Sequence, residues 1–147
     1  FVGPQLFLGI TFNPTIIVYA MTEQLSNPSM GYLFFAIACQ TIAFDSFYGL
    51  CDEKDDRNLR INSTPIWWGK KTLKIIGCLQ VVSILLLAKI GFIDELEYIW
   101  FIILIVLGVF FLYQQKLASH KKYLEAFKNN HWAHLLILLT AVLCYVG

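Results

Sequence analysis

Acidic side chains gather in one short stretch of the chain, Asp45 to Arg57, which begins inside an apolar run and continues beyond it. If the helix that contains the run continues to Asp56, Asp52 and Asp56 lie one turn apart, with Cβ atoms about 5 to 6 Å from each other. Two carboxylates at that separation repel unless a cation lies between them. Mg²⁺ is commonly held by one or two carboxylates, with water and phosphate oxygens as its other ligands. The spacing therefore predicts a Mg²⁺ site at Asp52 and Asp56.

Asp45 and Tyr48 lie on the same predicted helix face. With Thr41, Asp52 and Asp56 they follow the offsets i, i+4, i+7, i+11 and i+15, which trace one side of an α-helix. An ionisable group costs roughly 2.5 to 3.5 kcal/mol at the centre of a membrane span and less near its end. We interpret Asp45 as functional for that reason. The alternative is a carboxylate that reaches back to the membrane interface, for which an aspartate side chain is short.

Cations accompany the acids in the same stretch, namely Lys54, Arg57 and Arg60. Arginine binds phosphate oxygens in a bidentate manner, so cations beside a carboxylate pair suit a diphosphate ligand. The alternative is that these cations only orient the chain in the membrane, and both roles are compatible.

Two other structures could also place acids in this stretch: a calcium-binding EF-hand and a solvated surface loop. An EF-hand counted from Asp52 fails, because position 6 is Arg57 rather than Gly and position 12 is Ser63 rather than Glu. An ordinary solvated acidic loop stays open, because D-x-x-x-D by itself is a weak motif.

The composition places these residues in a membrane protein. The 147 residues are 58% hydrophobic and only 14% charged, whereas a soluble domain carries about 25% charged residues. We therefore expect an all-α integral membrane bundle whose surface faces a lipid bilayer. The net charge of +1 gives no reason to expect nucleic acid as a partner.

Five stretches approach the length of about 20 apolar residues that a membrane-spanning helix needs. They are Leu6–Met21, Gly31–Cys51, Leu73–Ile90, Tyr98–Tyr113 and Trp132–Val146. An alternating topology places ten of the eleven Lys and Arg residues on one side of the membrane and leaves Lys89 on the other. That asymmetry indicates that the side with the acidic loop is cytoplasmic.

The stretch from Asp45 to Gly69 resembles the second aspartate-rich region of UbiA-type membrane prenyltransferases, and within them the 4-hydroxybenzoate polyprenyltransferases of ubiquinone biosynthesis. Three other places agree with the resemblance: Pro4-Gln5 with Leu8-Gly9, Tyr113-Gln114-Gln115-Lys116-Leu117, and Phe127-Lys128-Asn129-Asn130. The resemblance covers essentially the whole chain, in order.

The resemblance implies that residues 1–147 form the C-terminal portion of a single nine-helix transmembrane domain. It implies a polyprenyl diphosphate and a 4-hydroxybenzoate-like aromatic acid as substrates, with Mg²⁺ as cofactor. Asp52 and Asp56 match the family's second metal-binding motif, and Asp55 lies within it. The first motif, N-D-x-x-D-x-x-x-D, is absent from this sequence, so the chain alone should be inactive. The implied location is the bacterial or mitochondrial inner membrane, with the acidic loop on the cytoplasmic or matrix side.

The chain departs from the family pattern at three positions. Relatives often have Lys where it has Asn58 and Asn62, and Gly where it has Arg60. Arg57 and Arg60 are therefore our candidates for the diphosphate, with Lys54 beside them. Asp45 and Tyr48 are expected to orient the substrates. The rival hypotheses are a prenyltransferase with another aromatic acceptor, a cation-transport segment with Asp45 on the ion path, and a remnant without catalytic activity.

Overall fold

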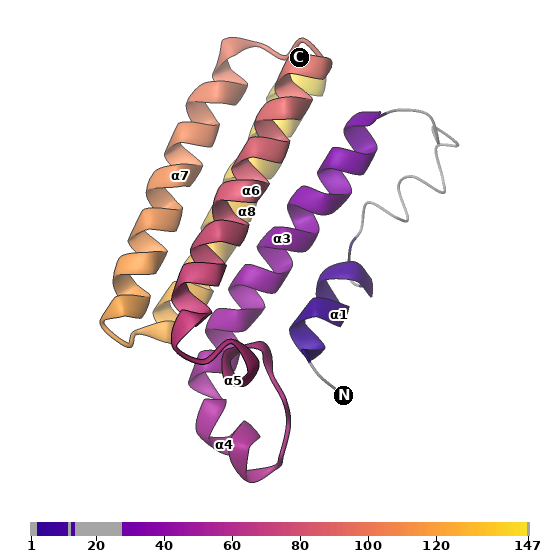
Figure 1. Cartoon of the computed structure of the whole chain (residues 1–147). Coiled ribbons are helices and arrows are strands. Elements are labelled where there is room, and N and C mark those ends of the chain that lie inside the picture. The colour runs from indigo at the N-terminus through magenta and orange to yellow at the C-terminus, as the bar shows by residue number, and fades with distance from the viewer. Residues whose placement is uncertain (1–2, 12, 14–27, 147) are drawn as a thin grey trace.

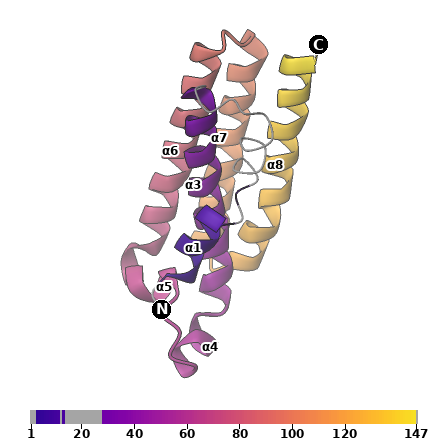
Figure 2. The ribbon, with the colours of Figure 1, turned by 90° about the vertical axis from the view of Figure 1, so that its right-hand side faces the viewer.

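The structure of the protein, a computed structural model, describes residues 3–11, 13 and 28–146. This part of the chain contains helices and no β-strand. Four long helices, α3, α6, α7 and α8, run side by side, and α1 packs along α3 (Figures 1 and 2). The long helices are α3 (Pro28–Cys51), α6 (Thr72–Ile93), α7 (Tyr98–Ser119) and α8 (Tyr123–Val146). The short elements are α1 (Pro4–Thr11), α4 (Glu53–Asn58), α5 (Thr64–Trp68) and the 3-10 turn η1 (Gly69–Lys71).

Three of the five predicted membrane spans are confirmed by length and composition. The segments Pro28–Cys51, Thr64–Ile93 and Tyr98–Ser119 are long and apolar enough to cross a bilayer. The fifth predicted span lies within α8, a helix of 24 residues that begins nine residues earlier than expected. The first begins in α1, and its remainder, except for Asn13, lies outside the described residues. The chain is thus an all-α integral membrane protein, as the composition predicts.

The connectors place the acidic turn and most of the basic residues at one end of the bundle. Residues 52–71, which include α4 and α5, lie beyond one end of the long helices, and the α7–α8 connector, residues 120–122, lies at the same end (Figure 1). We call this the loop end. The α6–α7 connector lies at the opposite end, where Asp94 accepts a hydrogen bond of 2.5 Å from Ser29. The alternating arrangement that the basic residues predicted is therefore present in the helices that the structure describes.

Three helices end in the same C-terminal capping motif. Arg60, Glu95 and Lys121 have left-handed backbones, with φ of 56°, 51° and 61°. The residue after each donates its amide to a carbonyl five positions back, and for Arg60 this bond joins Ile61 N to Asp56 O at 2.8 Å. That is the Schellman arrangement, in which glycine is the usual left-handed residue. Charged residues occupy the position in all three turns.

Apolar side chains fill two clusters along the bundle axis. The larger one joins α3, α6, α7 and α8 through buried residues such as Leu87, Leu104 and Leu107. Within it, Trp100 is 4% exposed and its indole Nε1 donates to the carbonyl of Leu87 at 3.0 Å. The smaller cluster, around Phe47 and Ile76, lies nearer the loop end.

Amide side chains also bridge the helices. Gln80 of α6 donates to Gln114 of α7 at 2.7 Å, and Gln114 donates to Asn129 of α8 at 3.3 Å. Gln115 donates back to Gln80 at 3.0 Å. Gln114 is fully buried. We call Gln80, Gln114, Gln115 and Asn129 the amide network.

We expect Gln114→Leu to destabilise the bundle by about 1 to 2 kcal/mol, because it leaves Gln80 without its buried acceptor. Denaturant titration in detergent micelles measures the loss. Gln80→Leu alone should also destabilise, and the double variant should lose less than the two single losses together, since both unpaired partners are then removed. Additive losses in that double-mutant cycle would contradict the coupling.

Candidate functional site

The acidic turn at the loop end follows α3 with a one-residue break. α3 ends at Cys51, and Asp52 has φ −93° and ψ 2° before α4 begins at Glu53. The continuous helix to Asp56 on which the spacing argument was conditional is therefore interrupted at Asp52, and the predicted end of the span at Cys51 agrees with α3. Aspartate favours helix starts, and α4 has three acids in its first turn. The backbone spacing is nevertheless helical: Asp52 N donates to Tyr48 O at 3.2 Å, and Asp56 N donates to Asp52 O at 2.9 Å.

The three aspartates of this turn are differently exposed. Asp52 and Asp56 are half-buried, and Asp55 is exposed. Their side chains form no ion pair or hydrogen bond with the described residues, in which salt bridges join only Arg57 to Glu53 and Lys122 to Glu125. These carboxylates therefore remain available to a ligand from outside this chain.

The donor set of the turn fits part of a Mg²⁺ site. Asp52 and Asp56 offer carboxylate oxygens one helical turn apart. Among the described residues, no three or more His, Cys, Asp or Glu side chains gather closely enough to hold a metal ion. The pair can thus supply two ligands of an octahedral ion, and the other positions must come from water, a phosphate-bearing substrate or residues beyond those described.

Asp45 and Tyr48 lie deeper along α3. Asp45 is half-buried and its carboxylate forms no hydrogen bond with the described residues. Tyr48 is 43% exposed, and its ring centroid lies 5.2 Å from that of Phe127 of α8. Both residues therefore stand between the acidic turn and the middle of the bundle.

A pocket of about 280 Å³ opens between α3 and α8, on the side of the acidic turn that faces the bundle. Its lining consists of Phe44, Phe127, Lys128, Asn130, His131 and His134. The Phe44 ring lies 5.9 Å from Phe127 and 5.7 Å from His134, measured between centroids. Asn130 Nδ2 lies within hydrogen-bond distance of His134 Nδ1, at 3.2 Å. We call this the aromatic pocket. The sequence did not predict this pocket, because its walls come from helices that are far apart in the chain.

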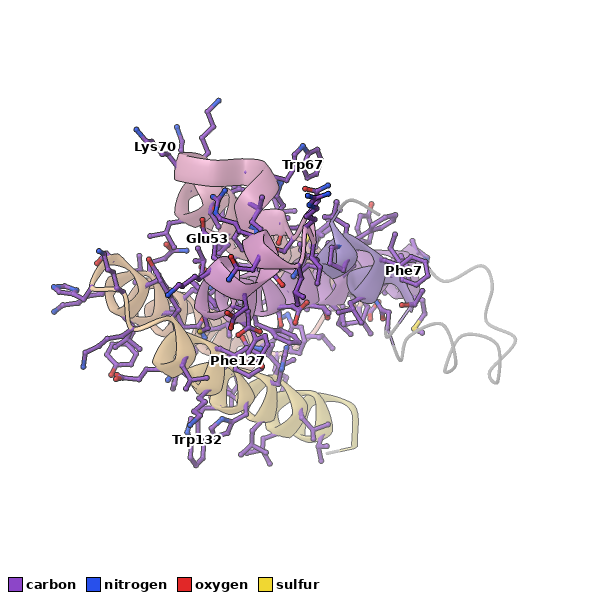
Figure 3. The ribbon with its side chains drawn as sticks, turned by 90° about the horizontal axis from the view of Figure 1, so that it is seen from below. Phe7, Glu53, Trp67, Lys70, Phe127 and Trp132 are labelled. Atoms are coloured by element: carbon purple, nitrogen blue, oxygen red, sulfur yellow. The ribbon has the colours of Figure 1, made fainter. Side chains whose placement is uncertain are left out.

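The predicted cations lie on or near the acidic turn, and none of them pairs with its aspartates in the described part of the chain. Lys54, Arg57 and Arg60 are all exposed. Arg57 donates from two nitrogens to one oxygen of Glu53, at 2.7 and 3.2 Å. Seen from the loop end, Glu53 and Phe127 lie toward the middle of the view, whereas Lys70 and Trp132 project outward on opposite sides (Figure 3).

Buried polar contacts attach the connector after α4 to the bundle. The first amide of α5, Thr64 N, donates to Gln5 Oε1 of α1 at 2.9 Å, and the hydroxyls of Thr64 and Ser46 share a hydrogen bond of 2.7 Å. The connector also accepts a bond from Gly3 N at Asn62 O, 2.8 Å long. Gln5 therefore holds the connector that returns from the acidic turn, a role that the sequence did not reveal.

The helical bundle and its acidic turn define an all-α integral membrane protein with a candidate site for a cation and a phosphate at one membrane face. The chain matches the UbiA prenyltransferase family over residues 1–136, and it belongs to that family. This finding confirms the resemblance seen in the sequence.

Curated relatives show which members of the family the chain is similar to. The chain is 31% identical to a 4-hydroxybenzoate octaprenyltransferase of Histophilus somni, over 95% of this chain and 50% of the relative. It is 32% identical to the protein of that name in Citrobacter koseri, over 98% and 51%, and 34% identical to that of Edwardsiella ictaluri, over 95% and 50%. The chain thus spans about half the length of the curated relatives it matches. No solved structure matches it.

Arg60 lies in the left-handed region, which costs a residue with a Cβ atom roughly 1 kcal/mol. We expect Arg60→Gly to raise the free energy of unfolding by about that amount, which thermal unfolding in micelles measures. Glu95→Gly is the matched control, because Glu95 has the same left-handed backbone conformation at the opposite end of the bundle. A lower melting temperature for Arg60→Gly alone would mean that the arginine side chain stabilises the loop more than its backbone costs.

Proposed function

We propose that the protein to which this chain belongs transfers a polyprenyl group from polyprenyl diphosphate to the ring of 4-hydroxybenzoate. The observation that carries the proposal is the pair Asp52 and Asp56, spaced by one helical turn and without protein partners among the described residues. Membership of the UbiA family and the names of the relatives support it. The ubiquinone pathway is the corresponding biological role.

On the donor side, Asp52 and Asp56 would hold Mg²⁺, with Asp55 beside them. Held there, Mg²⁺ would supply positive charge beside the diphosphate leaving group. Lys54, Arg57 and Arg60 stand around the same turn and can bind the remaining phosphate oxygens. The carbon–oxygen bond of the donor then breaks, and diphosphate leaves with the electron pair.

On the acceptor side, the ring must lie within reach of the carbon that diphosphate leaves. Phe44, which lines the aromatic pocket, precedes Asp52 by eight residues, so the pocket lies about two helical turns along α3 from the acidic turn. The rings of Tyr48 and Phe127 flank this position and can face an allylic cation. A ring carbon of the acceptor forms the new bond and loses its proton to a base. Asp45 and Tyr48 would orient the two substrates.

The acidic turn supplies two carboxylates to the proposed ion, and the family resemblance implies further ligands from a second acidic motif outside residues 1–147. The proposal therefore requires an N-D-x-x-D-x-x-x-D motif that faces Asp52. We expect it in the part of the full-length protein that corresponds to the half of the relatives not matched by this chain. The protein would lie in a bacterial or mitochondrial inner membrane, with the loop end on the cytoplasmic or matrix side, where basic residues gather.

We expect Asp52→Asn and Asp56→Asn in the full-length protein each to lower prenyl transfer at least 100-fold, since each removes a charge that binds the ion. Transfer of radiolabelled prenyl groups to 4-hydroxybenzoate measures the effect. Glu53→Gln is the control, because Glu53 is paired with Arg57, and it should retain most activity. Undiminished transfer by both aspartate variants at saturating Mg²⁺ would remove the basis of the proposal.

Two further measurements separate the rival functions. A panel of aromatic acceptors, with 4-hydroxybenzoate as one member, identifies a different ring if one is prenylated faster. A cation-transport segment predicts instead an ion flux into vesicles that depends on Asp45, without consumption of diphosphate.

The aromatic pocket gives a prediction for the acceptor alone. We expect Phe44→Ala to raise the KM for 4-hydroxybenzoate about tenfold, because a stacking face is lost, and to leave the KM for the donor nearly unchanged. Steady-state kinetics with each substrate varied in turn tests this. Phe35→Ala is the control, since Phe35 lies on the same helix and is 60% exposed. Equal rises in both KM values would show that Phe44 only supports the fold.

A further inference from the structure

A large groove runs between α6 and α7 on the outside of the bundle, away from the aromatic pocket. It has a volume of about 750 Å³ and a lining that is almost entirely apolar. Exposed side chains such as Val81, Val109 and Leu112 form its walls. Gly77 and Gly108 lie in it from opposite helices, and their missing side chains leave space for a ligand. Both helices belong to segments that are long and apolar enough to span a membrane, and an exposed apolar groove of this kind suits a surface that faces lipid.

The groove has the depth of one membrane leaflet. Along α6 it extends from Lys74 to Ile84, and along the antiparallel α7 from Gln115 to Ile105. Ten residues of helix rise about 15 Å, which is half of the roughly 30 Å hydrocarbon core of a bilayer. It begins at the loop end and stops near the middle of the membrane, as a single acyl chain does.

The mouth of the groove is basic. Lys74 lines it, and Lys70 and Lys71 lie one turn earlier, where η1 leads into α6. Lys116, in the last turn of α7, follows Gln115. All four lysines are exposed, and neither η1 nor the first turn of α6 contains an acidic residue. In Figure 3, Lys70 projects outward from this edge of the bundle.

We propose that this groove binds an anionic phospholipid from the leaflet at the loop end. One acyl chain lies between α6 and α7 against Gly77 and Gly108, and the phosphate group lies beside Lys74. The charge of the mouth selects the headgroup, because basic pockets between membrane helices bind anionic lipids. The apolar walls bind the chain. This site is separate from the acidic turn, and it does not depend on the proposed prenyl transfer.

The experiment is native mass spectrometry of the full-length protein, released from nanodiscs that contain equal amounts of phosphatidylglycerol and phosphatidylcholine with the same acyl chains. We expect phosphatidylglycerol to be retained preferentially. Lys74→Gln should lower its apparent affinity about fivefold, and Lys74→Arg should restore it. Lys89→Gln is the matched control, an exposed lysine of the same helix at the opposite end, and it should change nothing.

A second pair of variants tests the chain-binding part of the groove. A Cβ atom at Gly108 would meet Ile84 at an ordinary 3.7 Å, so Gly108→Leu fills the groove without displacing the backbone. It should reduce retention of both lipids. Gly31→Leu is its control, because a Cβ atom at Gly31 would meet no atom within 4 Å.

Three results would overturn the proposal. The first is equal retention of the two lipids, or equal effects of Lys74→Gln and Lys89→Gln. The second is retention of an added polyprenyl diphosphate, and of no phospholipid, in a manner that depends on Lys74, which would assign the groove to the donor. The third is protection of Cys78, which is exposed and lines the groove, from a lipid-soluble maleimide when the full-length protein has been delipidated in detergent. Another part of the protein would then cover this face.

Discussion

A buried polar side chain in a membrane bundle must find its partner inside the protein, because the bilayer core offers no water. The amide network satisfies this constraint with side chains from three helices, Gln80, Gln114 and Asn129. Apolar packing alone leaves helices free to slide, since lipid tails are as apolar as leucine. Paired amides fix the relative register of α6, α7 and α8, and thereby fix where α8 presents the wall of the aromatic pocket.

The same constraint applies at the loop end, where the chain leaves the regular helices. Three different elements meet at Thr64, whose amide binds Gln5 and whose hydroxyl binds Ser46. The connector that carries the acidic turn is therefore attached at its return point to α1 and α3. With that attachment, the acidic turn keeps its carboxylates close to the end of the bundle.

The sequence predicted the class of fold and the position of the acidic turn, because apolar run length and acid spacing are local properties. It did not predict the break at Asp52, since a single residue between two helical segments leaves the hydropathy pattern unchanged. Neither the aromatic pocket nor the partners of Gln5 were visible, because they depend on which helices become neighbours. Gln114 shows the same limit. A polar residue near a helix end suggests water, whereas here the neighbouring helices bury it completely.

Gly49 lies where α3 and the returning connector approach most closely. A Cβ atom there would come within 3.1 Å of both the Gln5 amide and the Pro65 ring, and Pro65 is rigid. Even alanine would therefore separate the connector from α3 by a few tenths of an ångström, three residues before Asp52. Positions 5, 49 and 65 consequently form one steric unit, and evolutionary change at any of them has to be matched at the others if the acidic turn is to keep its place.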